Sequence, residues 1–124
     1  MSGERKCRVM ICDDEPDFRA IVVDVVRGMG MDPVEVGRPE DFAGTYEADT
    51  PDIVVLDIVM PNIDGLELVD WLADAGYRGR LVLVSGYNPN YARAARTMAD
   101  LKGIAGVTVL QKPVSLADLR AVLA

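Results

Sequence analysis

Short apolar runs and amphipathic stretches alternate five times along the chain of 124 residues. Several runs are apolar at successive positions, as in the segment IVVL of residues 53–56. Successive apolar positions indicate strands that are buried on both faces, as in a parallel sheet. The pattern predicts five strands, at residues 7–12, 33–36, 52–57, 81–84 and 107–110.

Between these runs, apolar residues recur at spacings of three and four, which predicts amphipathic helices. We expect helices that begin near Pro16, Arg38, Leu66, Pro89 and Ser115. Strands that alternate with helices imply an α/β fold, with one parallel sheet covered on both faces and right-handed crossovers. The length is typical of a single domain, here residues 1–124.

The apolar faces of two helices predict which residues enter the core. In the first helix this face contains Phe18, Ile21 and Val25. In the fourth helix it contains Tyr91, Ala94, Ala95, Met98 and Leu101. Residues 58–65, which include two pairs of turn-forming residues, are expected to form a turn rather than a regular element.

Composition excludes several kinds of chemistry. The chain has no histidine, which rules out a Ser-His-Asp triad, a histidine general base and His-ligated zinc. The 20 acidic and 13 basic residues give a net charge of -7, which disfavours binding to nucleic-acid phosphates. We find no signal peptide and no apolar run long enough to cross a membrane. We therefore expect a cytoplasmic protein without nucleic-acid or membrane partners.

Polar side chains follow four of the five predicted strands. Asp13 and Asp14 follow the first strand, Asp57 ends the third, Ser85 follows the fourth and Lys112 follows the fifth. A single polar residue at a strand end often reflects only the exposure of loops. Ligands of open α/β sheets, however, bind beyond the carboxyl ends of the strands, so the joint pattern indicates a site.

The charges of these residues favour a divalent cation. The three aspartates carry three negative charges and Lys112 one positive charge, which leaves a net charge of -2. Oxygen ligands without imidazole or thiolate favour Mg²⁺ or Mn²⁺. An aspartate beside such an ion can accept a phosphoryl group, and a hydroxyl and an ammonium can then contact the phosphoryl oxygens.

The sequence resembles the response-regulator receiver domain, the CheY-like phosphoacceptor module of two-component signalling. The resemblance covers residues 7–124 and lies in the segments MICDDE, VVLDIVMPNIDG, LVLVSG and LQKP. It implies the flavodoxin-like strand order 2-1-3-4-5, of which CheY is a known example. It also implies a cis peptide bond before Pro113.

The resemblance assigns a role to each residue at the strand ends. Asp57 is expected to be the phosphoacceptor, Asp14 to bind Mg²⁺ directly and Asp13 to bind it more through water. The main-chain carbonyl of Val59 is expected to be a further metal ligand. The remaining two residues, Ser85 and Lys112, are expected to contact the phosphoryl group.

The resemblance also implies a signalling role rather than that of an enzyme with turnover, apart from intrinsic autophosphorylation and autodephosphorylation. The expected phosphoryl donor is a sensor histidine kinase or a phosphotransfer protein, and the signal passes to a downstream protein or output domain. Many family members carry an aromatic switch residue three positions before the lysine, where this chain has Val109. Either the switch is absent from this chain, or Tyr87 or a movement of its loop transmits the signal instead.

Two other functions fit parts of the pattern. The first is an Mg²⁺-dependent phosphohydrolase with an aspartate nucleophile, but haloacid dehalogenase-like enzymes carry Asp-x-Asp after the first strand, where this chain has Asp13-Asp14-Glu15. The second is a flavodoxin-type FMN module, which needs a phosphate loop rich in Ser, Thr and Gly at the same place. Phosphoryl uptake from acetyl phosphate, without continued phosphate release, separates a receiver from both.

Overall fold

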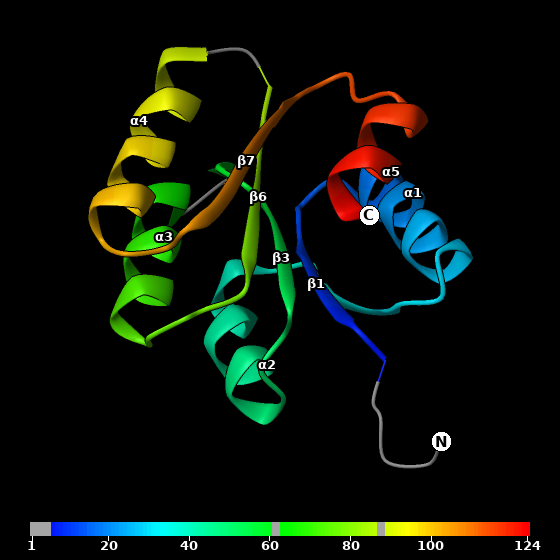
Figure 1. Ribbon diagram of the computed structural model, residues 1–124, viewed down its shortest axis with the longest axis horizontal. Coiled ribbons are helices and arrows are strands. Elements are labelled where there is room, and N and C mark those ends of the chain that lie inside the picture. The colour runs from blue at the N-terminus through cyan, green and yellow to red at the C-terminus, as the bar shows by residue number, and fades with distance from the viewer. Residues whose placement is uncertain (1–5, 61–62, 87–88) are drawn as a thin grey trace.

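A five-stranded parallel sheet forms the centre of the computed structural model, which describes residues 6–60, 63–86 and 89–124 (Figure 1). The strand order is β2-β1-β3-β6-β7, and all four neighbouring pairs are parallel. In chain order of these five strands, this is the predicted order 2-1-3-4-5. The strands are β1 (Arg8–Cys12), β2 (Asp32–Val36), β3 (Ile53–Asp57), β6 (Arg80–Ser85) and β7 (Gly106–Gln111).

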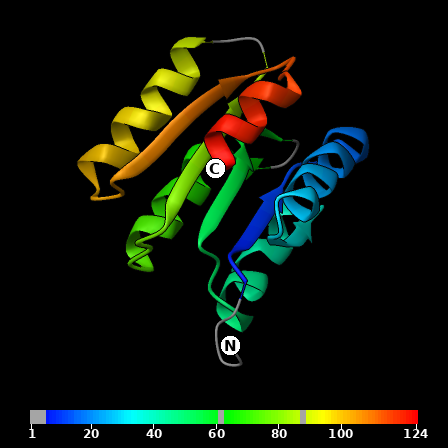
Figure 2. The ribbon, with the colours of Figure 1, turned by 45° about the vertical axis from the view of Figure 1, so that its right-hand side comes forward.

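Helices cover both faces of the sheet, as predicted. Two of them, α1 (Pro16–Gly28) and α5 (Leu116–Leu123), lie together on one face (Figures 1 and 2). The opposite face carries α2 (Phe42–Ala48), α3 (Gly65–Asp74) and α4 (Pro89–Leu101). A short 3₁₀ helix, Pro39–Asp41, precedes α2. Within the described residues, no helix combines the length and the hydropathy that crossing a bilayer requires.

The alternation of side chains along β1 separates two hydrophobic cores. Met10 and Cys12 pack into the core under α2, α3 and α4, whereas Val9 and Ile11 pack into the core under α1 and α5. All four side chains are at most 1% exposed, because successive residues of a strand point to opposite faces. This two-sided burial explains why the strands appear in the sequence as continuous apolar runs.

The predicted face of α4 was confirmed only in part. Leu101, expected in the core, is 82% exposed. Among the described side chains of this helix, Ala95 is buried as predicted, and Ala92 and Ala99 are buried although they were not predicted to be. The three alanines belong to the core under α4, and the larger Met98 packs against this core while only partly buried. On α1, Ile21 was also expected in the core and is 46% exposed.

The segment expected to be a simple turn contains a small hairpin. The strands β4 (Val59–Met60) and β5 (Ile63–Asp64) pair antiparallel, apart from the main sheet. The amide of Gly65, the first residue of α3, donates a hydrogen bond of 3.2 Å to the carbonyl oxygen of Ile58. This bond closes the segment directly behind the carboxyl end of β3.

Candidate functional site

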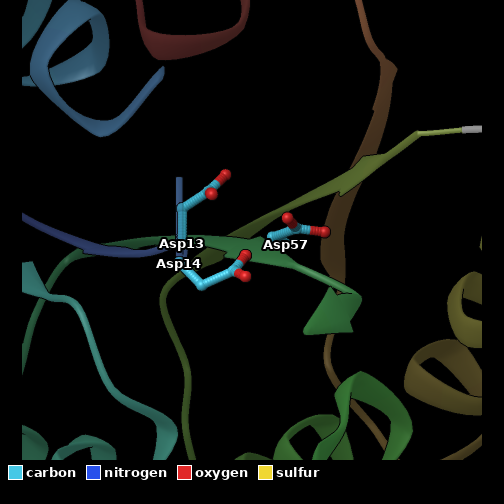
Figure 3. Close-up of side chains that lie close together, drawn as sticks. All are labelled: Asp13, Asp14 and Asp57. Carbon is cyan, nitrogen blue, oxygen red and sulfur yellow. The ribbon is translucent and has the colours of Figure 1, made fainter. Parts of the chain in front are cut away.

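Three aspartates meet at the carboxyl edge of the sheet (Figure 3). Asp13 and Asp14 follow β1 directly, and Asp57 is the last residue of the neighbouring strand β3. One carboxylate oxygen from each residue lies within 4.8 Å of the others. The prediction that these carboxylates lie together is therefore confirmed, because parallel neighbours end at the same edge.

Asp13 is the most deeply buried of the three, with 1% of its surface exposed. Its Oδ1 accepts a hydrogen bond of 2.8 Å from the amide of Glu15. Its Oδ2 is buried without a hydrogen-bond partner and lies 3.2 Å from Lys112 Nζ in an ion-pair contact. Burial raises the pKa of Asp13 to about 6, and the charge of Asp57 adds to this effect, while the Glu15 amide and Lys112 oppose it.

Lys112 lies directly after β7 and reaches across the same edge. Its Nζ donates a hydrogen bond of 3.3 Å to Asp57 Oδ2 and one of 2.7 Å to Glu15 Oε1. Burial alone would lower the pKa of this ammonium, but the neighbouring carboxylates of Glu15, Asp13 and Asp57 outweigh burial and raise the pKa above its ordinary value. Lys112 is therefore a permanent positive charge at the site. The peptide bond to Pro113 is cis, as predicted.

Ser85 ends β6 beside the aspartates and is 2% exposed. The Lys112 amide donates a hydrogen bond of 2.8 Å to the Ser85 carbonyl oxygen, which fixes the two strand ends to each other. Ser85 also lines a hollow of about 230 Å³ between α4 and β7, with Val109 among the other lining residues. The predicted positions of Ser85 and Lys112 at one edge are thus confirmed.

The residues present fit a hard divalent cation. The carboxylates of Asp13, Asp14 and Asp57 supply oxygen ligands, and the buried Asp13 Oδ2 has the unused acceptor capacity of a ligand atom. The nearby Cys12 does not offer a thiolate, because burial and neighbouring carboxylates raise its pKa to about 12. Oxygen ligands of this kind suit Mg²⁺ or Mn²⁺. Val59 begins β4 two residues after Asp57, and the role of its carbonyl stays a prediction.

Three residues of α1 and its entry contact the site and were not predicted to do so. Glu15 and Phe18 contact Lys112, with the ammonium 4.6 Å from the centre of the Phe18 ring. Arg19 donates a hydrogen bond of 2.7 Å to the main-chain oxygen of Asp13. Only Glu15 carried a signal in the sequence, as a third acidic residue beside the Asp13-Asp14 pair. Tyr87, the predicted alternative route of output, lies outside the described residues.

Comparisons with known proteins test the predicted family and fold. Residues 9–124 match the family model described as response regulator receiver domain. The nitrate/nitrite response regulator protein NarL of Escherichia coli is 30% identical over 105 residues, which cover 81% of this chain and 48% of NarL. The chain thus spans about half the length of this curated relative.

Solved structures show the same fold over nearly the whole chain. A response regulator from Colwellia psychrerythraea matches with a TM-score of 0.81 and 28% identity, and the match covers 96% of this chain and 94% of that one. A CheY-like response regulator receiver domain protein from Methanospirillum hungatei matches with a TM-score of 0.82 and 18% identity, over 96% of this chain and 91% of that one. At this level of identity the second match concerns the fold alone.

Proposed function

Because the chain belongs to the response regulator receiver domain family, a family of two-component signalling domains, we propose that Asp57 is its phosphoacceptor. The observation that carries this proposal is the position of Asp57, buried at the end of β3 between the carboxylates of Asp13 and Asp14 and the ammonium of Lys112. The family match over residues 9–124 also supports a single receiver domain.

In the proposed reaction, a carboxylate oxygen of Asp57 attacks the phosphorus atom of the donor. A new oxygen–phosphorus bond forms, and the bond from phosphorus to the donor breaks. The leaving group keeps the electron pair of the broken bond. It is a carboxylate when the donor is an acyl phosphate, and a neutral imidazole when the donor is a phosphohistidine whose second ring nitrogen carries a proton. Since Asp57 attacks as an anion, this step needs no general base.

The other residues of the site are proposed to bind Mg²⁺ or to contact the phosphoryl group. Asp14 would bind Mg²⁺ directly, Asp13 would bind it more through water, and Asp57 with the Val59 carbonyl would complete the proposed protein ligands. When bound, the cation supplies positive charge that compensates the aspartates and the transferred phosphoryl group. Lys112 contacts the phosphoryl oxygens with its permanent positive charge, and the Ser85 hydroxyl donates a hydrogen bond to them.

We propose partners on the same basis. A sensor histidine kinase or a phosphotransfer protein supplies the phosphoryl group, because the chain itself has no histidine. A downstream protein or output domain receives the signal, and both exchanges take place in the cytoplasm. The protein acts as a signalling component with only its own phosphorylation and dephosphorylation as chemistry.

The test uses acetyl phosphate and intact-protein mass spectrometry. With Mg²⁺, the wild-type protein should gain the mass of one phosphoryl group, and chelation of Mg²⁺ should prevent the gain. Asp57→Asn should gain nothing, whereas Asp24→Asn, an exposed residue on α1, should behave like the wild type. Uptake by Asp57→Asn would contradict the assignment, and continuous phosphate release from many esters would indicate a phosphohydrolase instead.

A further inference from the structure

The ammonium of Lys112 makes its shortest polar contact outside the group of three aspartates. The distance from Nζ to Glu15 Oε1 is 2.7 Å, compared with 3.2 Å to Asp13 Oδ2 and 3.3 Å to Asp57 Oδ2. The Phe18 ring lies on the same side, with its centre 4.6 Å from Nζ. Glu15 and Phe18, at the start of α1, therefore hold the ammonium of Lys112, which is proposed to contact the phosphoryl group.

Glu15 does not belong to the carboxylates that could share a cation. The cluster with mutually close oxygens comprises Asp13, Asp14 and Asp57. The Glu15 side chain is 61% exposed, whereas the side chains of Asp13 and Asp57 are 2% and 5% exposed. The Glu15 carboxylate thus contacts Lys112 from the solvent side of the site.

We propose that Glu15 is a positioning residue that competes with the phosphoryl group for the Lys112 ammonium and so slows phosphorylation of Asp57. The inference rests on the proposed function, since it assumes that Lys112 must move onto the phosphoryl oxygens. Phe18 supports the held position through its ring face, which attracts cations.

The charges of the site explain the competition. Phosphorylation converts the Asp57 carboxylate, which has one negative charge, into an acyl phosphate with about two negative charges. Lys112 must then turn toward the new charge, and its 2.7 Å contact with Glu15 has to lengthen. A contact that exists before the reaction and weakens during it adds to the barrier, because it stabilises the starting state more than the transition state.

A general charge effect must be separated from this specific contact. Glu15 and Asp17 both line a hollow of about 470 Å³, together with Lys112 and Pro113. Either acid would repel an anionic donor there. Asp17 makes no ion pair with Lys112 in the described part of the chain, so Asp17→Asn removes the same charge from the same hollow without releasing the lysine.

The experiment measures the initial rate of phosphorylation by acetyl phosphate at saturating Mg²⁺ for the wild type, Glu15→Gln and Asp17→Asn. Glu15→Gln should react about two- to fivefold faster than Asp17→Asn, the range expected for loss of one partly exposed ion pair. Glu15→Ala, which removes the charge and also the oxygen that could accept a hydrogen bond from the ammonium, should show at least the same increase. Thermal unfolding should show that all variants fold, so that a change in rate is not a change in stability.

A second measurement separates a positioning role from a structural one. In Glu15→Gln, the released ammonium lies closer to Asp13 and Asp57 and competes with the cation, so Mg²⁺ should bind more weakly than to Asp17→Asn. Equal rates and equal Mg²⁺ affinities in the two variants would overturn the role of Glu15. Failure of the wild type to take up any phosphoryl group would instead overturn the proposed function.

Discussion

Arg19 Nη1 donates a hydrogen bond of 2.7 Å to the main-chain oxygen of Asp13. The same guanidinium pairs through Nε with Glu35 of β2, at 3.0 Å from its Oε1. The Asp13 amide in turn donates a bond of 3.3 Å to the Val36 carbonyl oxygen in β2. The backbone that carries the two adjacent aspartates is therefore fixed from α1 and from β2, and the carboxylates are held before any cation binds.

We predict that Arg19→Met weakens Mg²⁺ binding by about tenfold, as expected when a residue that orients metal ligands is lost. Loss of a positive charge alone would strengthen the binding of a cation, so the two effects have opposite signs. Arg27→Met, in the last turn of the same helix, removes a positive charge farther from the site and leaves the hydrogen bond to Asp13 in place. Magnesium titration of both variants checks the prediction, and equal or tighter binding by Arg19→Met would show that the hydrogen bond does not position the site.

The affinity for Mg²⁺ should depend on pH through Asp13. Burial and the charge of Asp57 raise the pKa of Asp13 to about 6 in the metal-free protein, despite the opposing Glu15 amide and Lys112. A cation must displace the proton from a protonated carboxyl group, so affinity should be nearly constant above that pKa and fall by up to about tenfold per pH unit below it. Isothermal titration between about pH 5 and pH 8 measures this slope; a flat profile would mean that Asp13 is already ionised throughout.

The sequence predicts the outline of the fold because the two-sided burial of parallel strands leaves continuous apolar runs. It predicts the face of α4 only in part, since Ala95 is buried as predicted, whereas Leu101 looks like a core residue and is exposed while Ala99 is buried. The hairpin of β4 and β5 was missed because each strand has two residues, too few to show a periodicity.

The same contrast applies to the site. Asp57 and Lys112 were predictable because strand ends converge at one edge of a parallel sheet. Glu15, Phe18 and Arg19 were not, because their roles depend on how far long side chains reach across neighbouring elements. Such reach leaves no pattern in the spacing of residues along the chain.

Burial of the Asp13 charge should cost stability in the metal-free protein. The folded-state pKa of about 6 lies above the ordinary value of 3.8, so the folded protein holds an extra proton between these values. The free energy of unfolding therefore has its largest contribution from Asp13 below the ordinary pKa of 3.8. This contribution falls as the pH rises from there to about 6 and beyond. Asp13→Asn avoids the charge and should unfold with a free energy about 1–2 kcal/mol higher than the wild type at about pH 7.5 in a chelator.

Denaturant titrations at about pH 7.5 and about pH 4 check this prediction, because the advantage of Asp13→Asn should shrink when the wild-type carboxyl group is protonated. Adding Mg²⁺ at the higher pH should stabilise the wild type and leave the variant less affected, since the cation binds only the folded site. Asp24→Asn, exposed on α1, serves as the control. A wild type that is more stable than Asp13→Asn in the chelator would contradict the cost of burying this charge.

Gly65 is required where α3 begins behind the site. A Cβ atom added there would lie 2.3 Å from Ile58 Cα and 2.6 Å from its carbonyl oxygen, and Ile58 directly follows Asp57. Both neighbours are backbone atoms, so relief of the clash must move the start of α3, the backbone that follows Asp57, or both. We predict that Gly65→Ala lowers the free energy of unfolding by about 1–3 kcal/mol, the range typical of overpacking, and weakens Mg²⁺ binding because Asp57 shifts.

Gly44 provides the matched control. It lies inside α2, and an added Cβ atom there would meet nothing within 4 Å. Gly44→Ala should therefore raise the free energy of unfolding by about 0.5–1 kcal/mol, because alanine favours a helix more than glycine does, with Mg²⁺ affinity unchanged. If Gly65→Ala were as stable as Gly44→Ala and bound Mg²⁺ as the wild type does, the close approach of α3 to Ile58 would not constrain the site.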